Sequence, residues 1–365
     1  MEKNIKPRTK VLHIVEAFGG GVYEIIKDLS NNLSDKYEII IAYGKRKELP
    51  KNFKEEFNQS IKFVEVSNFT RSIKPIKDIK ALKEINKIIK DEKPDIIQLH
   101  SSKAGILGRL ARKYKAKLFY VPHGFAFLKQ DDNIIKRKIY WMIEKITAIY
   151  NKKCTIIACS QGEYEEAKKL NKNSIEIDNG ISIEKIQKEI KDKEHTINWD
   201  NIIVCTVGRI DYQKNPQQFN DIARKFPNIK FKWIGDGHLR QILEQKNIEI
   251  MGWIIKKDVL KEVGSSDIFI LTSLWEGMPV ALLEAMYMKK ICIVSNVIGN
   301  RDVIKNNENG YIANNTEEFC KIIDNIIKTR KDTVSKNAHS DIIKKYSIKT
   351  MSENYQKLYE RELKC

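Results

Sequence analysis

Two glutamates frame a short turn in the stretch "WEGMPVALLEAM", residues 275–286. The stretch follows an apolar run typical of a strand, and it continues with apolar residues at helical spacing. Pro279 suits the first position of that helix, where its missing N–H costs nothing. Glu276 therefore lies in the loop and Glu284 on the helix, on either side of backbone N–H groups. A purely structural role suits Glu284 poorly, because a carboxylate on a mostly apolar helix turn would have no partner.

Two cations on a single loop form a second group of interest. Arg209 and Lys214 occur in "VGRIDYQKNP", which follows a predicted strand and precedes a helix that starts near Pro216. Two cations beside a helix N-terminus can hold a diphosphate. The alternative is a surface loop with two ordinary cations.

Glycines and a histidine occupy similar positions in the first half of the chain. Gly19, Gly20 and Gly21 follow the first predicted strand in "FGGGVYEII", where they would let the backbone approach an anion at a helix start. A tight turn explains these glycines equally well. His123 follows the fifth predicted strand in "VPHGF". A lone histidine is more often structural than catalytic, but the end of a strand favours a functional role.

Strands that alternate with helices must position these residues. In the first half, strands are predicted at 11–15, 37–42, 61–66, 95–100, 118–122, 155–159 and 174–178, and helices at about 22–33, 76–90, 104–114, 133–150 and 163–170. The pattern then restarts, with strands at 202–207, 230–234, 248–251, 267–271 and 291–294. This alternation predicts an α/β protein of two Rossmann-like, doubly wound domains that face a cleft. Ligands of such sheets bind beyond the carboxyl ends of the strands.

Composition is consistent with two domains. The chain has 365 residues, of which 42% are hydrophobic, enough for two cores. The longest apolar runs fall short of a membrane span, and "MEKNIKPRTK" leads straight into a strand, so we expect no signal peptide. The six cysteines are scattered without a CxxC pair. That spacing favours free thiols in a reducing cytoplasm over a disulfide framework or a zinc site.

The basic residues concentrate in two stretches of a chain whose formal net charge is +18. Residues 71–90 contain seven basic and two acidic residues, and residues 133–153 contain six basic and one acidic residue. The charge suits nucleic acid, an anionic membrane or a phosphorylated substrate as partner. Both stretches also carry apolar residues at helical spacing. We expect these apolar faces to pack on the sheet, so that only the lysines meet solvent or lipid.

Together the motifs resemble those of the retaining nucleotide-sugar glycosyltransferases of family 4, which have the GT-B architecture. The resemblance runs nearly end to end and rests on "GGG" at 19–21, "HGF" at 123–125, "DNGI" at 178–181, "GRIDYQK" at 208–214, "GDG" at 235–237 and "EGMPVALLE" at 276–284. The last motif is similar to the family's pair of glutamates eight positions apart. In "GNRDVI" the chain has Asp302 where many members have glutamate, which we expect to tune the loop.

The resemblance implies a division of labour between the domains. Residues 1–183 would form an N-terminal acceptor-binding domain and residues 184–345 a C-terminal domain that binds the nucleotide-sugar donor. The closing segment, 346–365, looks like the family's C-terminal helix, which packs back on the first domain.

The resemblance also implies roles for the residues around the donor. Glu284 would accept hydrogen bonds from the ribose hydroxyls, and Glu276 would lie near the hydroxyls of the donor sugar. The turn between them would offer backbone N–H groups to the sugar and the phosphate; its residues are Gly277, Met278, Pro279 and Val280.

Further roles follow for the cations, the histidine and the glycines. Arg209 and Lys214 would neutralise the charge that develops on the leaving nucleoside diphosphate. His123 would hydrogen-bond the donor sugar near its C6 hydroxyl. Gly20 and Gly21 would let the first domain close over the phosphates.

The implied reaction is sugar transfer with retention of configuration, in which the leaving phosphate takes the acceptor proton and no side chain acts as nucleophile. No carboxylate or histidine cluster has metal-ligand spacing, so we expect no metal and no cofactor. The expected donor is a UDP-hexose or UDP-N-acetylhexosamine. The expected acceptor is a polyprenyl diphosphate-linked saccharide of bacterial O-antigen, capsule or exopolysaccharide synthesis. The enzyme would be cytoplasmic and peripheral on the inner face of the cell membrane, without a nucleic-acid partner.

Several alternatives stay open at this point. A GDP-mannose-dependent mannosyltransferase would carry the same motifs, and a nucleotide-sugar epimerase can share the architecture but would need general acid and base residues. A dehydrogenase is disfavoured because GxGxxG is missing. A nucleic-acid binder would explain the charge, but no recognised module or stacking platform is present. A non-catalytic scaffold is disfavoured because every donor-site position is filled.

Overall fold

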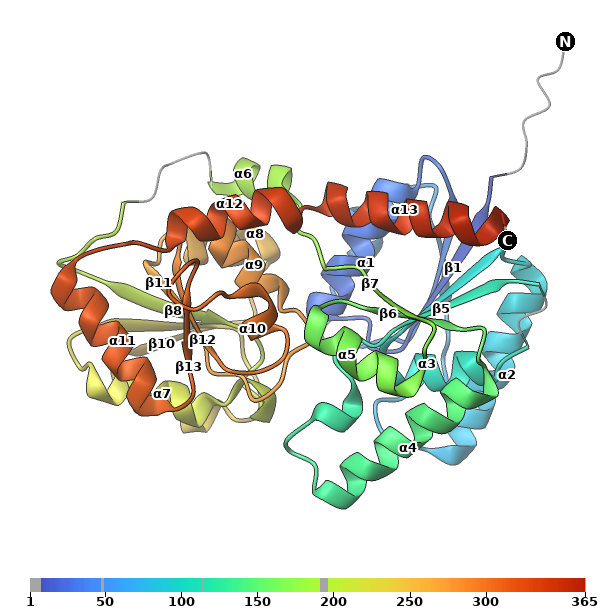
Figure 1. Ribbon diagram of the computed structural model, residues 1–365, viewed down its shortest axis with the longest axis horizontal. Coiled ribbons are helices and arrows are strands. Elements are labelled where there is room, and N and C mark those ends of the chain that lie inside the picture. The colour runs from blue at the N-terminus through green and yellow to red at the C-terminus, as the bar shows by residue number, and fades with distance from the viewer. Residues whose placement is uncertain (1–7, 47–48, 113–114, 191–195, 365) are drawn as a thin grey trace, which may run out of the picture. The chain divides into compact units, whose positions relative to one another are not determined.

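The computed structural model describes residues 8–46, 49–112, 115–190 and 196–364 (Figure 1). The chain divides into two compact units. The bounds of the first unit are Met1–Phe127, Ile134–Asp178 and Ile348–Cys365, and those of the second are Leu128–Asn133 and Asn179–Ser347. The main boundary therefore follows Asp178, slightly before the position that the sequence suggested.

A seven-stranded parallel sheet forms the centre of the first unit. Its strands are β1 (Lys10–Val15), β2 (Glu38–Tyr43), β3 (Lys62–Glu65), β4 (Ile96–His100), β5 (Lys117–Val121), β6 (Thr155–Ala158) and β7 (Ser174–Glu176). They lie in the order β3-β2-β1-β4-β5-β6-β7. Most of these strands are runs of β-branched and other apolar residues because helices cover both faces of the sheet. The strand order reverses beside β1, and such a switch point is where doubly wound sheets bind ligands.

Helices connect the strands of the first unit, and a C-terminal helix is added to them. They are α1 (Gly20–Leu33), α2 (Pro75–Glu92), α3 (Ser101–Leu110), α4 (Ile134–Tyr150), α5 (Gln161–Leu170) and α13 (Ile348–Lys364), with 3-10 turns η1 (Phe53–Glu56) and η2 (Ala126–Leu128). The helix predicted over 104–114 begins earlier and ends at Leu110, and residues 113–114 lie outside the described residues.

The last helix, α13, packs on the first unit beside α1 (Figure 1). The hydroxyl of Tyr359 donates a hydrogen bond to the side-chain oxygen of Gln98 on β4. The ring of Tyr359 meets that of Tyr37 edge-on, with 5.5 Å between the centroids. Lys36 Nζ donates to Gln356 Oε1 at 2.6 Å. These contacts make the C-terminal segment part of the first unit's core.

The second unit has a six-stranded parallel sheet in the order β10-β9-β8-β11-β12-β13. Its strands are β8 (Ile203–Val207), β9 (Lys230–Ile234), β10 (Ile248–Gly252), β11 (Ile268–Leu271), β12 (Ile291–Ser295) and β13 (Tyr311–Ala313). Its helices are α6 (Ile183–Ile190), α7 (Pro216–Lys225), α8 (Lys256–Gly264), α9 (Val280–Tyr287), α10 (Asn300–Val303), α11 (Thr316–Thr329) and α12 (Ser335–Lys345), with η3 (Tyr212–Lys214) and η4 (Arg240–Ile242). The short strand β13 was not among the strands predicted from the sequence.

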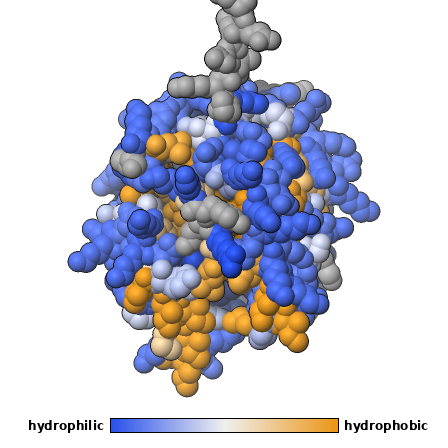
Figure 2. Space-filling model, turned by 90° about the vertical axis from the view of Figure 1, so that its right-hand side faces the viewer, coloured by the Kyte–Doolittle hydropathy of each residue, from blue (hydrophilic) through white to orange (hydrophobic). Residues whose placement is uncertain are grey.

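The apolar faces of α2 and α4 correct one expectation. On α2, the C-terminal isoleucines pack inward, but Ile76 and Ile79 are 74% and 57% exposed. On α4, the apolar face points outward; its exposed members are Ile134, Ile135, Ile139, Trp141, Met142, Ile146, Ile149 and Tyr150. Figure 2 shows apolar side chains gathered along one edge of the molecule's face, where Figure 1 places α4 and the start of α2.

A buried ion pair explains why α4 turns its apolar face outward. The inward side of α4 carries Glu144, which pairs with the fully buried Arg109 of α3. Tyr120 of β5 donates a further hydrogen bond to Glu144 Oε1 at 2.9 Å. An unpaired buried carboxylate or guanidinium would be costly, so these partners fix the rotation of α4. Helical spacing alone identifies an apolar face but not the side on which it lies.

Within the described ranges, no helix has both the length and the apolar character needed to cross a bilayer.

Candidate functional site

Two loops of the second unit lie side by side at the carboxyl ends of its neighbouring strands β8 and β11. The first loop contains η3, and the second leads into α9. The backbone N–H of Leu274 donates to the carbonyl of Gln213 at 2.8 Å, and Gln213 Nε2 donates to the carbonyl of Trp275 at 3.0 Å. The hydroxyl of Thr272 donates to the carbonyl of Lys214 at 2.8 Å. These bonds hold the predicted cation loop against the predicted glutamate loop.

The structure brings Lys214 and Glu276 into direct contact. Lys214 Nζ lies 2.6 Å from Glu276 Oε1, and both side chains are largely buried. The aliphatic stem of Lys214 lies over Gly208, where a Cβ would come within 2.8 Å of it. Arg209 pairs with Asp211 at 3.3 Å, and its side chain is 38% exposed. Of the two cations on this loop, Arg209 is the more accessible to a ligand.

Glu284 has a partner that the sequence argument did not provide. Lys256, the first residue of α8, places Nζ 2.5 Å from Glu284 Oε1, and the glutamate side chain is 8% exposed. The argument that Glu284 would lack a partner is therefore wrong. Nothing in the sequence distinguishes Lys256 from the many other lysines, because it lies 28 positions before Glu284. A carboxylate has about four acceptor positions, so this ion pair leaves capacity for hydroxyl donors.

The turn between the glutamates presents the start of α9. Helix α9 begins at Val280, with Pro279 as its N-cap residue instead of its first residue, and no side chain caps it. Asn179 Nδ2 donates to the carbonyl of Met278 at 3.1 Å. A Cβ on Gly299 (φ 83°) would lie 2.1 Å from the carbonyl oxygen of Gly277, so only glycine fits there. The turn is thus held from two sides while its helix start stays uncapped, as an anion site requires.

Asp302 supports the backbone that covers this turn. Its Oδ2 accepts a hydrogen bond from the N–H of Gly299 at 3.1 Å. Aspartate, although shorter than the glutamate of many family members, therefore still contacts this loop. Asn179 lies in the "DNGI" motif, but its contact with Met278, 99 positions away, leaves no signal in the sequence.

The remaining predicted residues, Gly20, Gly21 and His123, belong to the first unit. Gly20 starts α1 with φ 55°, and a Cβ there would meet open space. Its backbone conformation, and not its surroundings, therefore favours glycine. Gly21 is exposed beside it. His123 follows β5 and has φ 53°.

His123 is the end of a chain of three histidines. His100, the last residue of β4, places Nδ1 2.9 Å from His123 Nε2, and its Nε2 lies 3.0 Å from Nδ1 of His13 on β1. Burial lowers the pKa of His13 and of His123 to about 4 and that of His100 well below its usual value. All three rings are therefore neutral near pH 7. Only the strand-end position of His100 could have indicated this chain from the sequence.

The far end of the chain indicates how its protons are arranged. His13 Nε2 is buried and has no hydrogen-bond partner among the described residues. Orphaned buried N–H groups are rare, so we assign His13 Nε2 as the bare nitrogen and Nδ1–H as the donor to His100. His100 then donates from Nδ1 to His123 Nε2, and the proton of His123 resides on Nδ1. In this assignment His123 offers an N–H donor.

Glu163 fixes the loop that carries His123. Its Oε1 accepts from the N–H of Gly124 at 2.6 Å, and its Oε2 accepts from the N–H of Cys159 at 2.8 Å. The sequence "SQGE" has the Ser-x-x-Glu pattern of a helix start, and Ser160 Oγ accepts from the N–H of Glu163. That pattern was the available signal for a glutamate with a role at this site.

Comparison with known proteins places both units in glycosyltransferase families. Residues 19–185 match the family model described as Glycosyltransferase Family 4, and residues 187–347 match that of Glycosyl transferases group 1. A relative from Escherichia coli, named UDP-Gal:alpha-D-GlcNAc-diphosphoundecaprenol alpha-1,3-galactosyltransferase, is 33% identical over 338 residues, covering 83% of this chain and 84% of that protein.

Two further comparisons extend this result. A Campylobacter jejuni protein, named N,N'-diacetylbacillosaminyl-diphospho-undecaprenol alpha-1,3-N-acetylgalactosaminyltransferase, is 25% identical over 82% of this chain and 86% of its own length. The solved structure of sucrose-phosphate synthase from Thermosynechococcus elongatus matches with a TM-score of 0.78 at 14% identity, covering 97% of this chain and 99% of that one. At that identity the structural match shows the fold alone.

Proposed function

This chain belongs to glycosyltransferase family 4, and on that premise we propose that it transfers a hexose or N-acetylhexosamine from a UDP-sugar to a polyprenyl diphosphate-linked saccharide. One observation carries the proposal: the Lys214–Glu276 pair and the uncapped start of α9 lie at the same edge of the sheet. The names of the relatives from Escherichia coli and Campylobacter jejuni support the choice of a diphosphate-linked lipid acceptor.

The donor's nucleotide would occupy the second unit. Glu284 would accept hydrogen bonds from the ribose hydroxyls, and Lys256 would hold that carboxylate in place through their ion pair. Glu276 would accept from hydroxyls of the donor sugar while Lys214 holds it in place. The N–H groups at the start of α9, including that of Val280, would face the phosphate.

The chemical step would break the bond between the sugar C1 and the phosphate oxygen, with the electron pair passing to the phosphate. Arg209 and Lys214 would stabilise the negative charge that develops there, which is the largest contribution that a protein makes to such a transfer. The acceptor oxygen would form the new bond to C1 on the same face, and its proton would move to the leaving phosphate. The reaction would thereby retain configuration without a nucleophilic side chain, and the two cations would serve without a metal.

The first unit would contribute contacts to the donor sugar and phosphates. The histidine chain would aim the Nδ1–H of His123 at a sugar hydroxyl, and His100 would act as a positioning residue. Gly20 and Gly21 would bring the backbone at the start of α1 close to the phosphates, since neither carries a side chain that would stand in the way.

Because the proposed acceptor is linked to a lipid, the enzyme would have to meet it at a membrane surface. The exposed apolar face of α4, together with Ile76 and Ile79 of α2, lies among the basic residues of the stretches 71–90 and 133–153. We propose that these apolar side chains enter the interface of the inner membrane leaflet while the neighbouring lysines contact anionic headgroups. The protein would then be peripheral on the cytoplasmic side.

A screen of nucleotide sugars tests the donor assignment. Purified protein is scanned for thermal stabilisation and for slow donor hydrolysis with UDP-galactose, UDP-glucose, their N-acetylated forms and GDP-mannose. We expect a UDP-sugar to stabilise the wild type and Glu284→Gln to lose most of that shift. A response to GDP-mannose alone, or conversion of a donor to its epimer, would overturn the assignment.

A further inference from the structure

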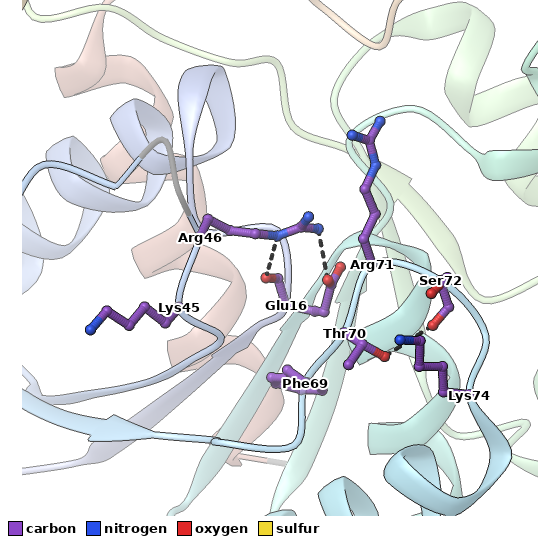
Figure 3. A pocket seen from close by; sticks show the side chains of 8 residues that line it. All are labelled: Glu16, Lys45, Arg46, Phe69, Thr70, Arg71, Ser72 and Lys74. Carbon is purple, nitrogen blue, oxygen red and sulfur yellow. Dashed lines mark hydrogen bonds and ion pairs between the residues drawn. The ribbon is translucent and has the colours of Figure 1, made fainter. Parts of the chain in front are cut away.

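A cationic cavity opens at the sheet edge of the first unit, and none of the residues assigned to the donor is among those that line it. Its volume is about 390 Å³. Its lining comes from the segments that follow β1, β2 and β3, which are neighbours in the sheet. The lining residues are Glu16, Lys45, Arg46, Phe69, Thr70, Arg71, Ser72 and Lys74 (Figure 3). The cavity therefore lies beyond the carboxyl ends of the strands, where such sheets bind ligands.

The lining contains four cationic side chains and a single carboxylate. The carboxylate, Glu16, is already occupied: Arg46 Nη2 lies 2.7 Å from its Oε1, and Arg46 Nε donates to its carbonyl at 3.3 Å. Lys103 neighbours the cavity but donates to Asp78 Oδ1 at 2.8 Å and to Thr70 Oγ1.

The other three cationic side chains of the lining are not paired with a carboxylate within the described residues. Among the residues that the structure describes, Lys45, Arg71 and Lys74 form no ion pair. Figure 3 shows the side chain of Arg71 extended, with no bonded partner among the residues drawn. Three unpaired cations beside a neutralised Glu16–Arg46 pair give the cavity a positive charge, which suits a ligand with two or more negative charges.

Exposed apolar side chains lie next to the cavity's lining residues along the chain. Ser72 and Lys74 line it, and Ile73 between them is 62% exposed. The exposed Ile76 and Ile79 continue from there along α2. Cations and uncovered apolar side chains thus alternate within one short segment. A free nucleotide or inorganic phosphate would use only the cations, whereas a diphosphate carrying a hydrocarbon chain would use both.

We propose that this cavity binds the diphosphate of the lipid-linked acceptor, with Arg71 and Lys74 contacting its phosphate oxygens and the first lipid carbons lying on Ile73 and Ile76. The inference rests on the proposed use of a diphosphate-linked acceptor. It assigns a second diphosphate site to the chain, built from other residues than the one beside Arg209 and Lys214.

Direct binding tests the site without relying on catalysis. Geranyl diphosphate, inorganic pyrophosphate and UDP are titrated by calorimetry into the full-length wild type, into Arg71→Ala/Lys74→Ala, and into the control Lys87→Ala/Lys90→Ala. The control removes two exposed lysines of α2, the helix that begins directly after Lys74, and neither of them lines the cavity. We expect the Arg71/Lys74 variant to bind geranyl diphosphate about tenfold or more weakly, and the control to match the wild type.

The three ligands distinguish a lipid diphosphate from free pyrophosphate and from a nucleotide as the cavity's ligand. Geranyl diphosphate should bind more tightly than pyrophosphate, and UDP binding should be unchanged in the Arg71/Lys74 variant. Absence of geranyl diphosphate binding to the wild type, equal affinity for pyrophosphate, or an equal loss of UDP binding would each overturn the inference. Because Arg71 and Lys74 are exposed, their removal should leave thermal unfolding unchanged.

Transfer kinetics separate this inference from the proposed function. With an acceptor sugar linked to an alkyl diphosphate, the Arg71/Lys74 variant should show a raised KM for the acceptor and an unchanged KM for the donor. With the same sugar on a plain alkyl chain, the variant and the wild type should be alike. Equal KM values for the diphosphate acceptor would refute the site while leaving the transferase intact. If the enzyme used no acceptor at all, the proposed function would fail. The geranyl diphosphate titration would still show whether the cavity binds a lipid diphosphate.

Discussion

At the scale of single residues, the Lys214–Glu276 pair combines binding with charge stabilisation. A largely buried lysine and carboxylate 2.6 Å apart are individually costly to remove, because the remaining partner is left as an uncompensated charge. A substitution at Lys214 therefore affects folding as well as turnover. A test of its role must separate the two effects.

Neutralising both members of the pair makes that separation. In Lys214→Met/Glu276→Gln neither charge remains, so unfolding in urea should stay close to that of the wild type. Turnover should nevertheless fall about 100-fold or more, since a cation aimed at the developing charge is lost. Arg209→Ala should lower kcat in the same direction with little effect on stability, because its side chain is 38% exposed.

Lys230→Ala is the matched control for these variants. Lys230 lies on β9 of the same sheet in an exposed pair with Glu249, so its loss should leave kcat unaltered and cost at most about 1 kcal/mol. Wild-type turnover in both Arg209→Ala and the double variant would show that Arg209 and Lys214 do not stabilise the charge on the leaving phosphate.

The three histidines make the first unit sensitive to acid. Their folded-state pKa values lie below the ordinary 6.5, at about 4 for His13 and His123. The unfolded chain therefore binds more protons between pH 6.5 and 4, so the stability that the neutral rings contribute is complete above pH 6.5 and is lost as pH falls toward 4. Urea unfolding at pH 7.5 and 5.5 measures this loss.

A variant without one ring identifies the source of the acid sensitivity. His13→Phe keeps an aromatic ring but cannot take up a proton, so its stability should drop less between pH 7.5 and 5.5 than that of the wild type. His238→Gln, in the second unit, should behave as the wild type does. An equal drop in all three proteins would mean that the histidine chain does not cause the sensitivity.

At the scale of secondary-structure elements, the predicted strands lie within two residues of those observed, because alternating apolar strands and helices leave a strong local signal. The orientation of α4 was predicted wrongly. Its cause, the Arg109–Glu144 pair, joins residues 35 positions apart, and no local period reports such a contact. For the same reason, the contact of Lys256 with Glu284 and that of His13 with His100 were not predicted from the sequence. Strand-end motifs were visible in the sequence, whereas the partners that hold them were not.

The outward face of α4 leads to a prediction about membranes. Burying the side chains of Ile135 and Met142 in a lipid interface contributes about 25 cal/mol per Å² of apolar area, and each nearby lysine contributes about 1 kcal/mol on an anionic surface. Ile135→Asn/Met142→Asn should therefore reduce flotation with anionic liposomes. Reversing the charges of Lys80, Lys83 and Lys87 together should reduce it as well, and raised salt should weaken the binding further.

The control for this experiment lies in the other unit. Ile343 on α12 is similarly exposed, at 49%, so Ile343→Asn should float as the wild type does. Failure of the wild-type protein to bind anionic liposomes at low salt would exclude membrane contact through α4. Donor hydrolysis should stay intact in every one of these variants, because none of the changed residues belongs to the assigned donor site.

At the scale of the whole molecule, two doubly wound units joined in series carry different parts of the proposed reaction. The second unit holds most of the predicted donor residues, and the first holds Gly20, Gly21, the histidine chain, the cationic cavity and the exposed face of α4. The repeated strand–helix pattern was enough to predict this architecture. The boundary was less well defined, because residues just after Asp178 continue the motif "DNGI" without a break in composition.

Chelation tests whether this division of labour works without a metal. With Arg209 and Lys214 as the charges at the diphosphate, turnover should persist in excess EDTA and should not rise when Mg²⁺ or Mn²⁺ is added. Activity that disappears on chelation and returns with Mn²⁺ would show that the two cations are insufficient.

In the proposed reaction, the chain moves a sugar from a UDP-sugar to a diphosphate-linked acceptor with retention of configuration. The most direct measurement incubates the enzyme with an α-linked UDP-sugar from the donor screen and N-acetylglucosamine linked to an alkyl diphosphate, and determines the product's anomeric configuration by proton NMR. An α-glycoside should form in step with UDP release, and Lys214→Met/Glu276→Gln should form it about 100-fold or more slowly. A β-glycoside, or UDP release without any glycoside, would contradict it.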